Sequence, residues 1–426
     1  MTRLVRLLRH RNTLSLLGQG AQAGFGMLAF LLLARAVDAD ALGSWVLHLA
    51  TASFLHMCRR GIVKTGLVRF VAGADGADRR AMMGAGWTLG VAVTAVESAL
   101  VVAWGAWGPI PDGFGLFVTW YPLLAWATLP LHVGTWLAEA DDHFERVALA
   151  SILTRGGLAG GAALALLDPA AWPIARIALL DVLLTAGASA LFVALGWTHL
   201  ATIRSTQRTA VRTLFDFGKY SMGTLLGTHL LSSSDTYLIG LLLGPAAVAV
   251  YSVAQKAIRL VQVPLQALSA TVYPRLSALA QDDDRAALRR MIHQWTGRLT
   301  LGLLPILGAL FVMADPVVRV LGGDEYARAA PVLQWLLVYL ALTPLDRALG
   351  MLLDSLGTPR FNLVKVIGMV GVNVAGNLVA LLVWESVTAV AAVTTLTMLT
   401  GIAMGLHYAR RSTVPVTLRG MGSLHS

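Results

Sequence analysis

Residues 245–276 read PAAVAVYSVAQKAIRLVQVPLQALSATVYPRL, a mostly apolar stretch that is long enough to cross a bilayer as a helix. Its polar residues recur every three or four positions, which places them on one face of an α-helix: Ser252, Gln255, Lys256, Arg259, Gln262 and Gln266. A Lys or Arg at the centre of a bilayer costs about 2.5–3.5 kcal/mol. Lys256 and Arg259 are therefore expected to face a wet cavity or a bound anion rather than lipid.

The composition of the whole chain extends this interpretation. Of its 426 residues, 56% are hydrophobic and only 13% are charged, whereas a soluble domain carries about 25% charged residues. So few charges cannot coat the surface of a soluble chain of this length, which excludes a soluble globular enzyme, a disordered protein and a fibrous one. No alternating ten-residue pattern of a membrane β-barrel is present. We therefore predict an all-α polytopic membrane protein.

Twelve segments have the apolar length that a transmembrane helix needs. They are residues 13–35, 41–58, 82–104, 115–138, 147–167, 173–197, 214–236, 245–273, 294–314, 331–353, 361–384 and 386–408. The longest polar connections are expected near 59–81 and 315–330, and neither could house a catalytic domain. The function is therefore expected to reside between the helices.

The basic residues predict the orientation of these spans. With the N-terminus inside, nearly all loop Lys and Arg residues fall on the cytoplasmic side, and the turn between spans ten and eleven receives Arg360 and Lys365. The basic residues on the outer side are Arg35, Arg176, Arg319 and Arg328. We therefore predict a multi-pass membrane protein with both termini in the cytoplasm. The net charge of +10 is explained by these loops and not by nucleic-acid binding.

The two halves of the chain echo each other. LLGQGAQAG (16–24), ADALGSW (39–45) and DRRAMM (78–83) are matched in the same order by DFGKYSMG (216–223), PAAVAVYS (245–252) and LRRM (288–291). Six spans per half predict two six-helix lobes related by a parallel pseudo-two-fold repeat, although apolar helices also resemble each other by chance. The predicted parts are a basic amphipathic segment (1–12), an N-lobe (13–200), a linker (201–213), a C-lobe (214–408) and a cytoplasmic tail (409–426).

Span seven carries a second polar stripe, which ends in a carboxylate. Its members recur every three or four residues: Ser221, Thr224, Thr228, Ser232 and Asp235, with Lys219 at the cytoplasmic end. Further candidates for a polar cavity lining are Gln19, Gln22 and His56, and Arg59 comes directly after span two. Asp235 is expected either to neutralise Lys256 or Arg259 or to couple an ion. The alternative for the polar stripe of span eight is an inter-helix network of salt bridges and hydrogen bonds without a ligand.

Several other charged residues interrupt the spans, and known catalytic motifs are missing. Glu97 and Asp181 lie within spans, and Asp346 and Arg347 are expected to neutralise each other. The sequence lacks a Walker A motif, HExxH, CxxC and a Gly-rich dinucleotide fingerprint. The single cysteine, Cys58, excludes an intrachain disulfide. No enzyme activity, catalytic residue, metal site or cofactor is predicted, apart from coupling to Na⁺ or H⁺.

Four stretches carry a resemblance to a known family. Residues 232–279, SSSDTYLIGLLLGPAAVAVYSVAQKAIRLVQVPLQALSATVYPRLSAL, resemble the seventh and eighth helices of Wzx-type polysaccharide-export flippases. These belong to the multidrug/oligosaccharidyl-lipid/polysaccharide (MOP) superfamily. LLLARAVDADALGSWVL (31–47), GGDEYARAAPVLQWL (322–336) and LLDSLGTPRFNLVKVIGMVGVNVAGNLV (352–379) look similar to other parts of that family.

The resemblance implies a MOP/MATE-like fold, a central cavity and alternating access. It implies a flippase that moves undecaprenyl-pyrophosphate-linked oligosaccharide across the inner membrane for polysaccharide export. Implied partners are the lipid-linked oligosaccharide, the bilayer, and a glycan polymerase with export machinery, for a protein that works as a monomer. On this interpretation the substrate is bound by Lys256, Arg259, Gln255, Gln262, Gln266, Arg59 and Lys219.

Two alternatives to the flippase stay open. One is a small-molecule antiporter of the same superfamily, and the other is an integral-membrane glycan polymerase, ligase or glycosyltransferase. Lipid II is a less fitting substrate, because the cationic residues of span one in lipid II flippases have no counterpart between Gln19 and Leu33. The net cationic character of the predicted cavity disfavours cationic drugs as cargo.

Overall fold

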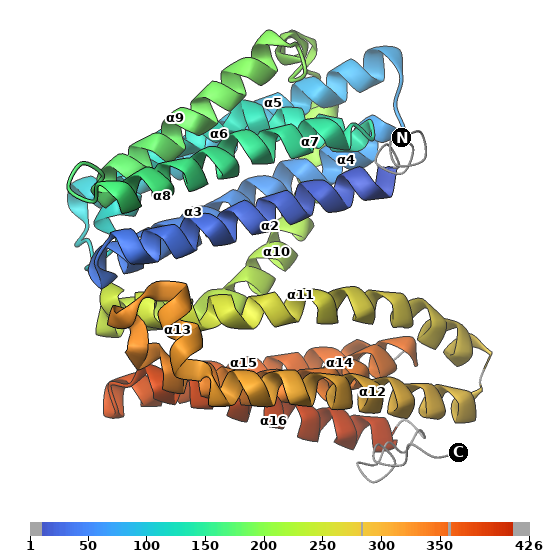
Figure 1. Cartoon of the computed structure of the whole chain (residues 1–426). Coiled ribbons are helices and arrows are strands. Elements are labelled where there is room, and N and C mark those ends of the chain that lie inside the picture. The colour runs from blue at the N-terminus through green and yellow to red at the C-terminus, as the bar shows by residue number, and fades with distance from the viewer. Residues whose placement is uncertain (1–10, 283, 357–358, 412–426) are drawn as a thin grey trace, which may run out of the picture. The chain divides into compact units, whose positions relative to one another are not determined.

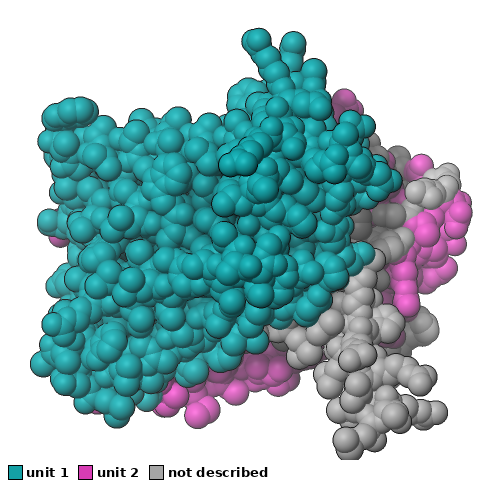
Figure 2. Space-filling view, turned by 90° about the horizontal axis from the view of Figure 1, so that it is seen from above, with its two compact units in different colours: residues 1–246 teal, residues 247–426 magenta. Residues whose placement is uncertain are grey.

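The computed structural model describes residues 11–282, 284–356 and 359–411, and these residues form helices joined by short turns, with no strand (Figure 1). The chain divides into two compact units, residues 1–246 and 247–426, which Figure 2 colours teal and magenta. The predicted all-helical architecture is confirmed for the described residues.

Unit 1 begins with long helices that are joined by short turns. Its helices are α2 (Arg11–Ala36), α3 (Ala39–Arg59), α4 (Thr65–Ala72), α5 (Gly76–Trp107), α6 (Gly115–Ala140), α7 (Phe144–Ser151), α8 (Gly157–Leu167), α9 (Ile174–Ala194) and α10 (Arg208–Leu243). Two π-helical turns, η1 (Arg60–Lys64) and η2 (Ile152–Gly156), join α3 to α4 and α7 to α8, and a 3₁₀ turn, η3 (Leu200–Ser205), precedes α10.

The predicted polar connection at 59–81 is wrong. The helix that starts at Ala39 runs through η1 to Ala72, and α5 begins at Gly76, so only residues 73–75 connect them. The basic residues after residue 58 suggested a loop, but the apolar residues between them, such as Val63 and Leu67, are fully buried. Alternating basic and buried apolar positions therefore mark an amphipathic extension of the helix.

Residues from α4, α5, α6 and α10 form a hydrophobic cluster in unit 1, centred on Leu67, Trp87, Leu129, Trp136 and Leu214. Two glycines let α10 approach the π turn η1 backbone to backbone. A Cβ on Gly61 would lie 2.3 Å from the Met222 Cα, and one on Gly218 would lie 2.2 Å from the Ile62 carbonyl oxygen. Such close contact between helices is typical of small residues in membrane proteins.

Pro130 lies inside α6 and removes one backbone N–H from its hydrogen-bond ladder. Next to it, a side chain of α9 forms hydrogen bonds with the α6 backbone. Ser189 of α9 inserts its hydroxyl into the α6 ladder, where it accepts from the Leu131 N–H at 3.1 Å and donates to the Ala127 carbonyl at 2.5 Å. A side chain in the i→i−4 ladder is a recognised cause of helix bending, as is proline. The hydroxyl also satisfies backbone groups that would otherwise be buried without a partner.

Unit 2 contains the second set of helices. They are α11 (Pro245–Gln281, whose first two residues belong to unit 1), α12 (Arg285–Val312), α13 (Ala314–Gly322), α14 (Ala330–Ser355), α15 (Pro359–Val383) and α16 (Val387–Arg411), with a 3₁₀ turn η4 (Asp324–Ala329) before α14. A hydrophobic cluster joins α11, α12, α14 and α16 through Leu276, Leu288, Ile292, Leu349 and Met398. Asp284 caps α12, because its carboxylate accepts from the Ala287 N–H at 2.9 Å.

Among the described residues, nine helical segments are long and apolar enough to cross a membrane. They are Ala39–Ala72, Gly76–Trp107, Gly115–Ala140, Phe144–Leu167, Ile174–Ala194, Arg285–Val312, Asp324–Ser355, Arg360–Val383 and Val387–Arg411. Large apolar side chains on these helices are open to the surroundings, and Leu100 is 64% exposed and Leu382 65% exposed. Such surfaces suit lipid contact and would be a liability in water.

The remaining predicted spans correspond to α2, α10 and α11. These helices have 26, 36 and 37 residues, and the two polar stripes lie on α10 and α11. That they also cross the membrane, to make twelve spans, stays a prediction. So does the pseudo-two-fold repeat.

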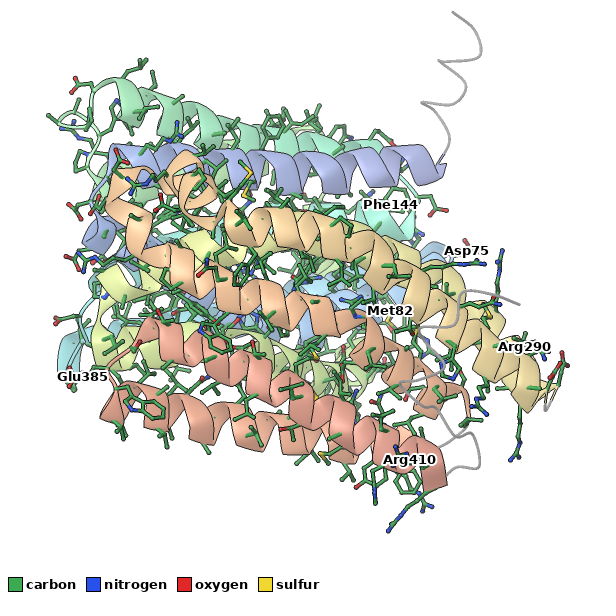
Figure 3. All side chains as sticks on the ribbon, turned by 60° about the horizontal axis from the view of Figure 1, so that its bottom comes forward. Asp75, Met82, Phe144, Arg290, Glu385 and Arg410 are labelled. Atoms are coloured by element: carbon green, nitrogen blue, oxygen red, sulfur yellow. The ribbon has the colours of Figure 1, made fainter. Side chains whose placement is uncertain are left out.

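Labelled residues mark the ends of the helices in each unit. In unit 2, Arg290 and Arg410 lie at one end of the helices and Glu385 lies at the other, as Figure 3 shows. In unit 1, Asp75 and Phe144 lie at a common end, next to the turns after α4 and α6 (Figure 3). That these ends face the cytoplasm stays a prediction.

Helix α10 belongs to unit 1, where it contacts α3, α5 and η1. The compact units therefore divide at residue 246, after α10, whereas the predicted lobes divide at the linker 201–213. The lobe boundary was inferred from the repeat and stays a prediction. So do the basic segment 1–12 and the tail 409–426, which lie mostly outside the described residues.

We expect Gly61→Ala to destabilise unit 1, because the added methyl group collides with the backbone of α10 at Met222. Overpacking of this kind costs about 1–3 kcal/mol, which should lower the melting temperature of the detergent-purified protein. Gly223→Ala is the matched control, since Gly223 lies in α10 with no neighbour within 4 Å of an added Cβ. Equal melting temperatures for the two variants would contradict the packing of α10 on η1.

Candidate functional site

The polar stripe predicted on span seven lies on α10, and most of it is exposed. Thr224, Thr228 and Ser232 are exposed. Their hydroxyls donate to carbonyls of their own helix, those of Tyr220, Thr224 and His229, at 2.9–3.2 Å. Hydroxyls bonded in this way can add a ligand oxygen or nitrogen without breaking the fold. Their role as cavity lining stays a prediction.

Ser221 and Lys219 make more specific contacts. Ser221 is half-buried and its hydroxyl donates to Thr65 Oγ1 of α4 at 3.0 Å, which ties α10 to the preceding helices of unit 1. Lys219 Nζ lies 2.8 Å from an Asp216 carboxylate oxygen and 5.2 Å from the centre of the Tyr220 ring. Asp216 is not among the predicted site residues, but its i,i+3 spacing from Lys219 is typical of an ion pair on a helix. Exposed pairs are weak, so Lys219 can exchange this partner for a ligand at little cost.

The stripe predicted on span eight lies on α11 and includes both exposed and buried residues. Arg259 is exposed, Gln255, Lys256 and Gln262 are half-buried, and Ser252 is buried. The side chain of Gln266 lies outside the described part of the structure, as does that of Gln19 on α2, whereas Gln22 is exposed. Asp235 is half-buried on α10. Its pairing with Lys256 or Arg259 stays a prediction.

Arg59 occupies a different environment from the other predicted basic residues. Its side chain is fully buried within unit 1, at 0% exposure, among α3, α5 and α6. Nη1 donates to Thr94 Oγ1 at 2.9 Å and to the Ala125 carbonyl at 2.8 Å. Nη2 donates to Thr128 Oγ1 at 2.7 Å and contacts His132 Nδ1 at 3.2 Å. Arg59 can therefore contact a substrate only if this network opens.

Three further side chains complete the cluster around Arg59. Tyr121 donates its hydroxyl to Glu97 Oε2 at 2.9 Å. The ring of His56 packs against that of Tyr121, 5.7 Å away between centroids, and edge-on against His132 at 5.3 Å. His56 Nε2 is buried without a hydrogen-bond partner. His56 and Arg59 are among the predicted site residues, whereas Glu97 was noted only as a charge within a span. Tyr121 and His132 were missed, because no spacing rule linked them to the others.

A second buried charge, that of Lys365, lies in unit 2, and the predictions for Lys365 and for Asp346 are both wrong. Lys365 is in α15, not in a turn, and it is only 3% exposed. Its Nζ lies 2.7 Å from Asp346 Oδ1 of α14. Asp346 therefore pairs with Lys365, and the predicted neutralisation by Arg347 is wrong, because adjacent residues point to different sides of a helix. Gly401 of α16 allows the close approach, since its Cβ would lie 3.0 Å from Asp346 Oδ1.

No group of three or more His, Cys, Asp or Glu residues lies close enough to hold a metal ion in the ranges 11–282, 284–356 and 359–411.

The cytoplasmic end predicted for unit 1 is held by ion pairs between α6 and its neighbours. Lys64 lies 2.7 Å from Glu139, and Arg79 lies 2.6 Å from Asp141. Both pairs are about three-quarters buried, which suits a structural role.

The fold is similar to that of solved transporters of the MOP superfamily. An inward-facing multidrug resistance MATE transporter of this superfamily matches with a TM-score of 0.72 at 14% identity, over 94% of this chain and 98% of that protein. The lipid II flippase MurJ in an inward closed conformation matches with a TM-score of 0.71 at 10% identity, over 96% of this chain and 89% of that protein. A MOP transporter from Pyrococcus furiosus matches with a TM-score of 0.57 at 15% identity, over 94% of each chain. The predicted MOP/MATE-like fold is confirmed.

Two sequence comparisons match part of this chain to proteins of polysaccharide or glycan biosynthesis. Residues 130–331 match the family described as polysaccharide biosynthesis protein. The probable low-salt glycan biosynthesis flippase Agl15 of Haloferax volcanii is 24% identical over 197 residues, and the match spans 46% of this chain and 42% of the relative. Together with the fold, these matches confirm the resemblance to Wzx-type flippases of the MOP superfamily.

We expect Thr128→Val to destabilise unit 1, because it removes a hydroxyl that accepts from the buried Arg59 guanidinium. A buried donor left without its acceptor costs about 1–3 kcal/mol. Thermal unfolding in detergent measures the loss. The matched control is Thr224→Val on α10, whose exposed hydroxyl bonds only to its own helix. If both variants melt with the wild type, the network around Arg59 does not support the unit.

In unit 2, we expect Asp346→Asn to destabilise the protein strongly, because it leaves the Lys365 ammonium buried without a counter-charge. Breaking one side of a buried pair costs about 3–5 kcal/mol. The double variant Asp346→Asn with Lys365→Met should regain most of the lost thermal stability. A double variant that is as unstable as Asp346→Asn alone would show that the pair is not the source of the loss.

Proposed function

We propose that this protein is a flippase that moves an undecaprenyl-pyrophosphate-linked oligosaccharide from the inner to the outer leaflet for polysaccharide export. It works by alternating access within a bacterial inner membrane, with both termini in the cytoplasm. The observation that carries the proposal is the row of basic and amide side chains on α11, a helix that is otherwise apolar, in a chain with the MOP fold. The match to a probable glycan biosynthesis flippase supports the same substrate class.

The chemistry of the cargo explains this row. A pyrophosphate must cross the apolar slab with its negative charge, and charge-assisted hydrogen bonds from Lys and Arg lower the cost of that passage. Lys256 and Arg259 are assigned to the pyrophosphate. Gln255, Gln262 and Gln266 carry amides that can both donate to and accept from sugar hydroxyls.

The residues of α10 contribute to the same passage. Ser221, Thr224, Thr228 and Ser232 offer hydroxyls to the glycan, and Lys219 meets the head group near the cytoplasmic end. Arg59 joins the substrate only after its buried network opens, because its side chain has no exposed surface in this structure. Gln19, Gln22 and His56 are assigned to the cavity wall.

Transport needs a step that resets the cationic residues after the anion leaves. Asp235 is assigned to this step, either as a counter-charge for Lys256 or Arg259 or as a site that couples Na⁺ or H⁺. No other cofactor is proposed. The protein is proposed to act as a monomer beside a glycan polymerase and export machinery, and not to be an enzyme.

The proposal predicts that Arg259→Glu abolishes flipping, because a carboxylate repels the pyrophosphate that the guanidinium binds. Purified protein in liposomes, with a lipid-linked oligosaccharide in one leaflet, measures flipping by the appearance of lectin-accessible glycan. Arg290→Glu is the matched control, since Arg290 is an exposed arginine at the end of α12 (Figure 3). It should retain flipping.

Other outcomes of this assay favour other functions. Flipping by Arg259→Glu at the wild-type rate would contradict the role of Arg259. Efflux of a small molecule without movement of the glycan lipid would identify an antiporter. Formation of a new glycosidic bond by the purified protein would identify a glycosyltransferase, polymerase or ligase.

A further inference from the structure

The buried cluster of unit 1 has an unusual balance of charge. The hydrogen bonds of the Arg59 guanidinium reach two threonine hydroxyls, a carbonyl and a histidine ring, and all of these are neutral acceptors. Since arginine has no acceptor, His132 must accept at Nδ1 and carry its proton on Nε2. The Arg59 Nε–H is buried without a partner. The positive charge is therefore solvated by dipoles and lacks a directly bonded counter-ion.

The nearest acid is also incompletely bonded. Glu97 is 4% exposed, and the carboxylate and the guanidinium attract each other electrostatically without a direct ion pair. Tyr121 donates to Oε2, but Oε1 is buried and has no hydrogen-bond partner. A buried carboxylate oxygen without a donor carries a large desolvation cost. A proton on Oε1 turns this oxygen into a hydroxyl and removes the charge.

We propose that Glu97 is a proton-binding site of unit 1, and that Arg59 is the counter-charge to which the ionised carboxylate binds after the proton leaves. With the carboxyl protonated, Arg59 bonds to its neutral acceptors, as the structure shows. After deprotonation, the carboxylate attracts Arg59 away from Thr94 and Thr128. Chains of acidic and histidine residues inside membrane helices are the usual basis of proton transfer.

The surroundings of Glu97 support this assignment. Of the titratable and charged groups that face the cluster, Glu97 is the carboxylate that acts on Arg59, and the other groups are basic or weakly acidic. These are His48, His56 and Cys58 of α3, Arg60 and Lys64 of η1, Tyr121 and His132 of α6, and Arg155 of η2. Lys64 is already paired with Glu139, and Arg155 interacts with Asp181 of α9. Arg59 bonds only to neutral acceptors, so loss of the proton from Glu97 creates an attraction between these two groups, which can drive movement.

The position of Arg59 provides a path for this movement. Arg59 is the last residue of α3, and the π turn η1 begins at the next residue. π turns inside α-helices often lie at functional sites. The backbone of α10 rests on η1 through Gly61 and Gly218. A shift of Arg59 toward Glu97 should therefore move α10, the helix that carries Lys219 and the hydroxyl stripe.

The proton site rests on the proposed function only for its use in transport, so its first test needs no substrate. Infrared difference spectroscopy of the purified full chain during a pH titration detects the C=O stretch of a protonated carboxyl. We expect a band in the wild type that is lost in Glu97→Gln and retained in Glu139→Gln. Glu139 is the matched control, because its carboxylate is ion-paired with Lys64 in the same unit.

A second variant keeps the test decisive if Glu97→Gln does not fold. Tyr121→Phe leaves the carboxyl in place but removes the donor to Oε2, so the band should persist and move to higher frequency. Identical spectra for the wild type, Glu97→Gln and Tyr121→Phe at every pH would overturn the proposal.

The second test links the site to transport. In liposomes, the flipping rate of the wild type should depend on an imposed pH gradient, and Glu97→Gln should lose that dependence.

A missing infrared band refutes the proton site whether or not the protein flips a lipid. A band that is present in a wild type that moves no glycan lipid refutes the proposed function and leaves the proton site standing. Equal gradient dependence of wild type and Glu97→Gln would refute the link to transport.

Discussion

Burying a charge inside an apolar slab is costly, and this cost organises both units. In unit 1, the guanidinium of Arg59 is enclosed by hydroxyls, a carbonyl and an imidazole from α5 and α6, so that three helices meet around one cation. In unit 2, Lys365 of α15 meets Asp346 of α14, with α16 packed closely at Gly401. Each buried charge therefore specifies which helices must be neighbours.

The polar residues of these helices fall into two groups that differ in burial. Arg59 and Lys365 are buried and hydrogen-bonded, and they hold helices together. The hydroxyls of α10 and Arg259 of α11 are exposed and leave their polar atoms available. The proposed transport of an anionic lipid would use both groups: buried charges that hold the helices of each unit together, and exposed polar groups that can exchange partners with the cargo. The cluster around Arg59 and Glu97 shares features of both groups. It is buried, but Glu97 Oε1 and Arg59 Nε have no hydrogen-bond partner.

Much of the fold could be predicted from the sequence, and the failures have a common cause. Apolar length placed the helices, and the family resemblance identified the MOP fold, which the structure confirms. The predicted loop at 59–81 was wrong because basic residues were taken as signs of exposure, whereas the apolar residues between them are buried. Lys365 was misplaced for the same reason. A charge in a sequence does not show whether a partner on another helix neutralises it.

The sequence by itself determined that this is an all-helical membrane protein, because apolar length and helical period are local properties that lipid enforces along each segment. It also identified the two polar stripes, since residues three or four apart must share a face. Only the tertiary structure decided which polar residues are buried together. Arg59 and Glu97 are far apart in sequence, and no local period links them to Tyr121 or His132. Their neighbours are set by the packing of α3, α5 and α6, where a polar group must find its partner on another helix.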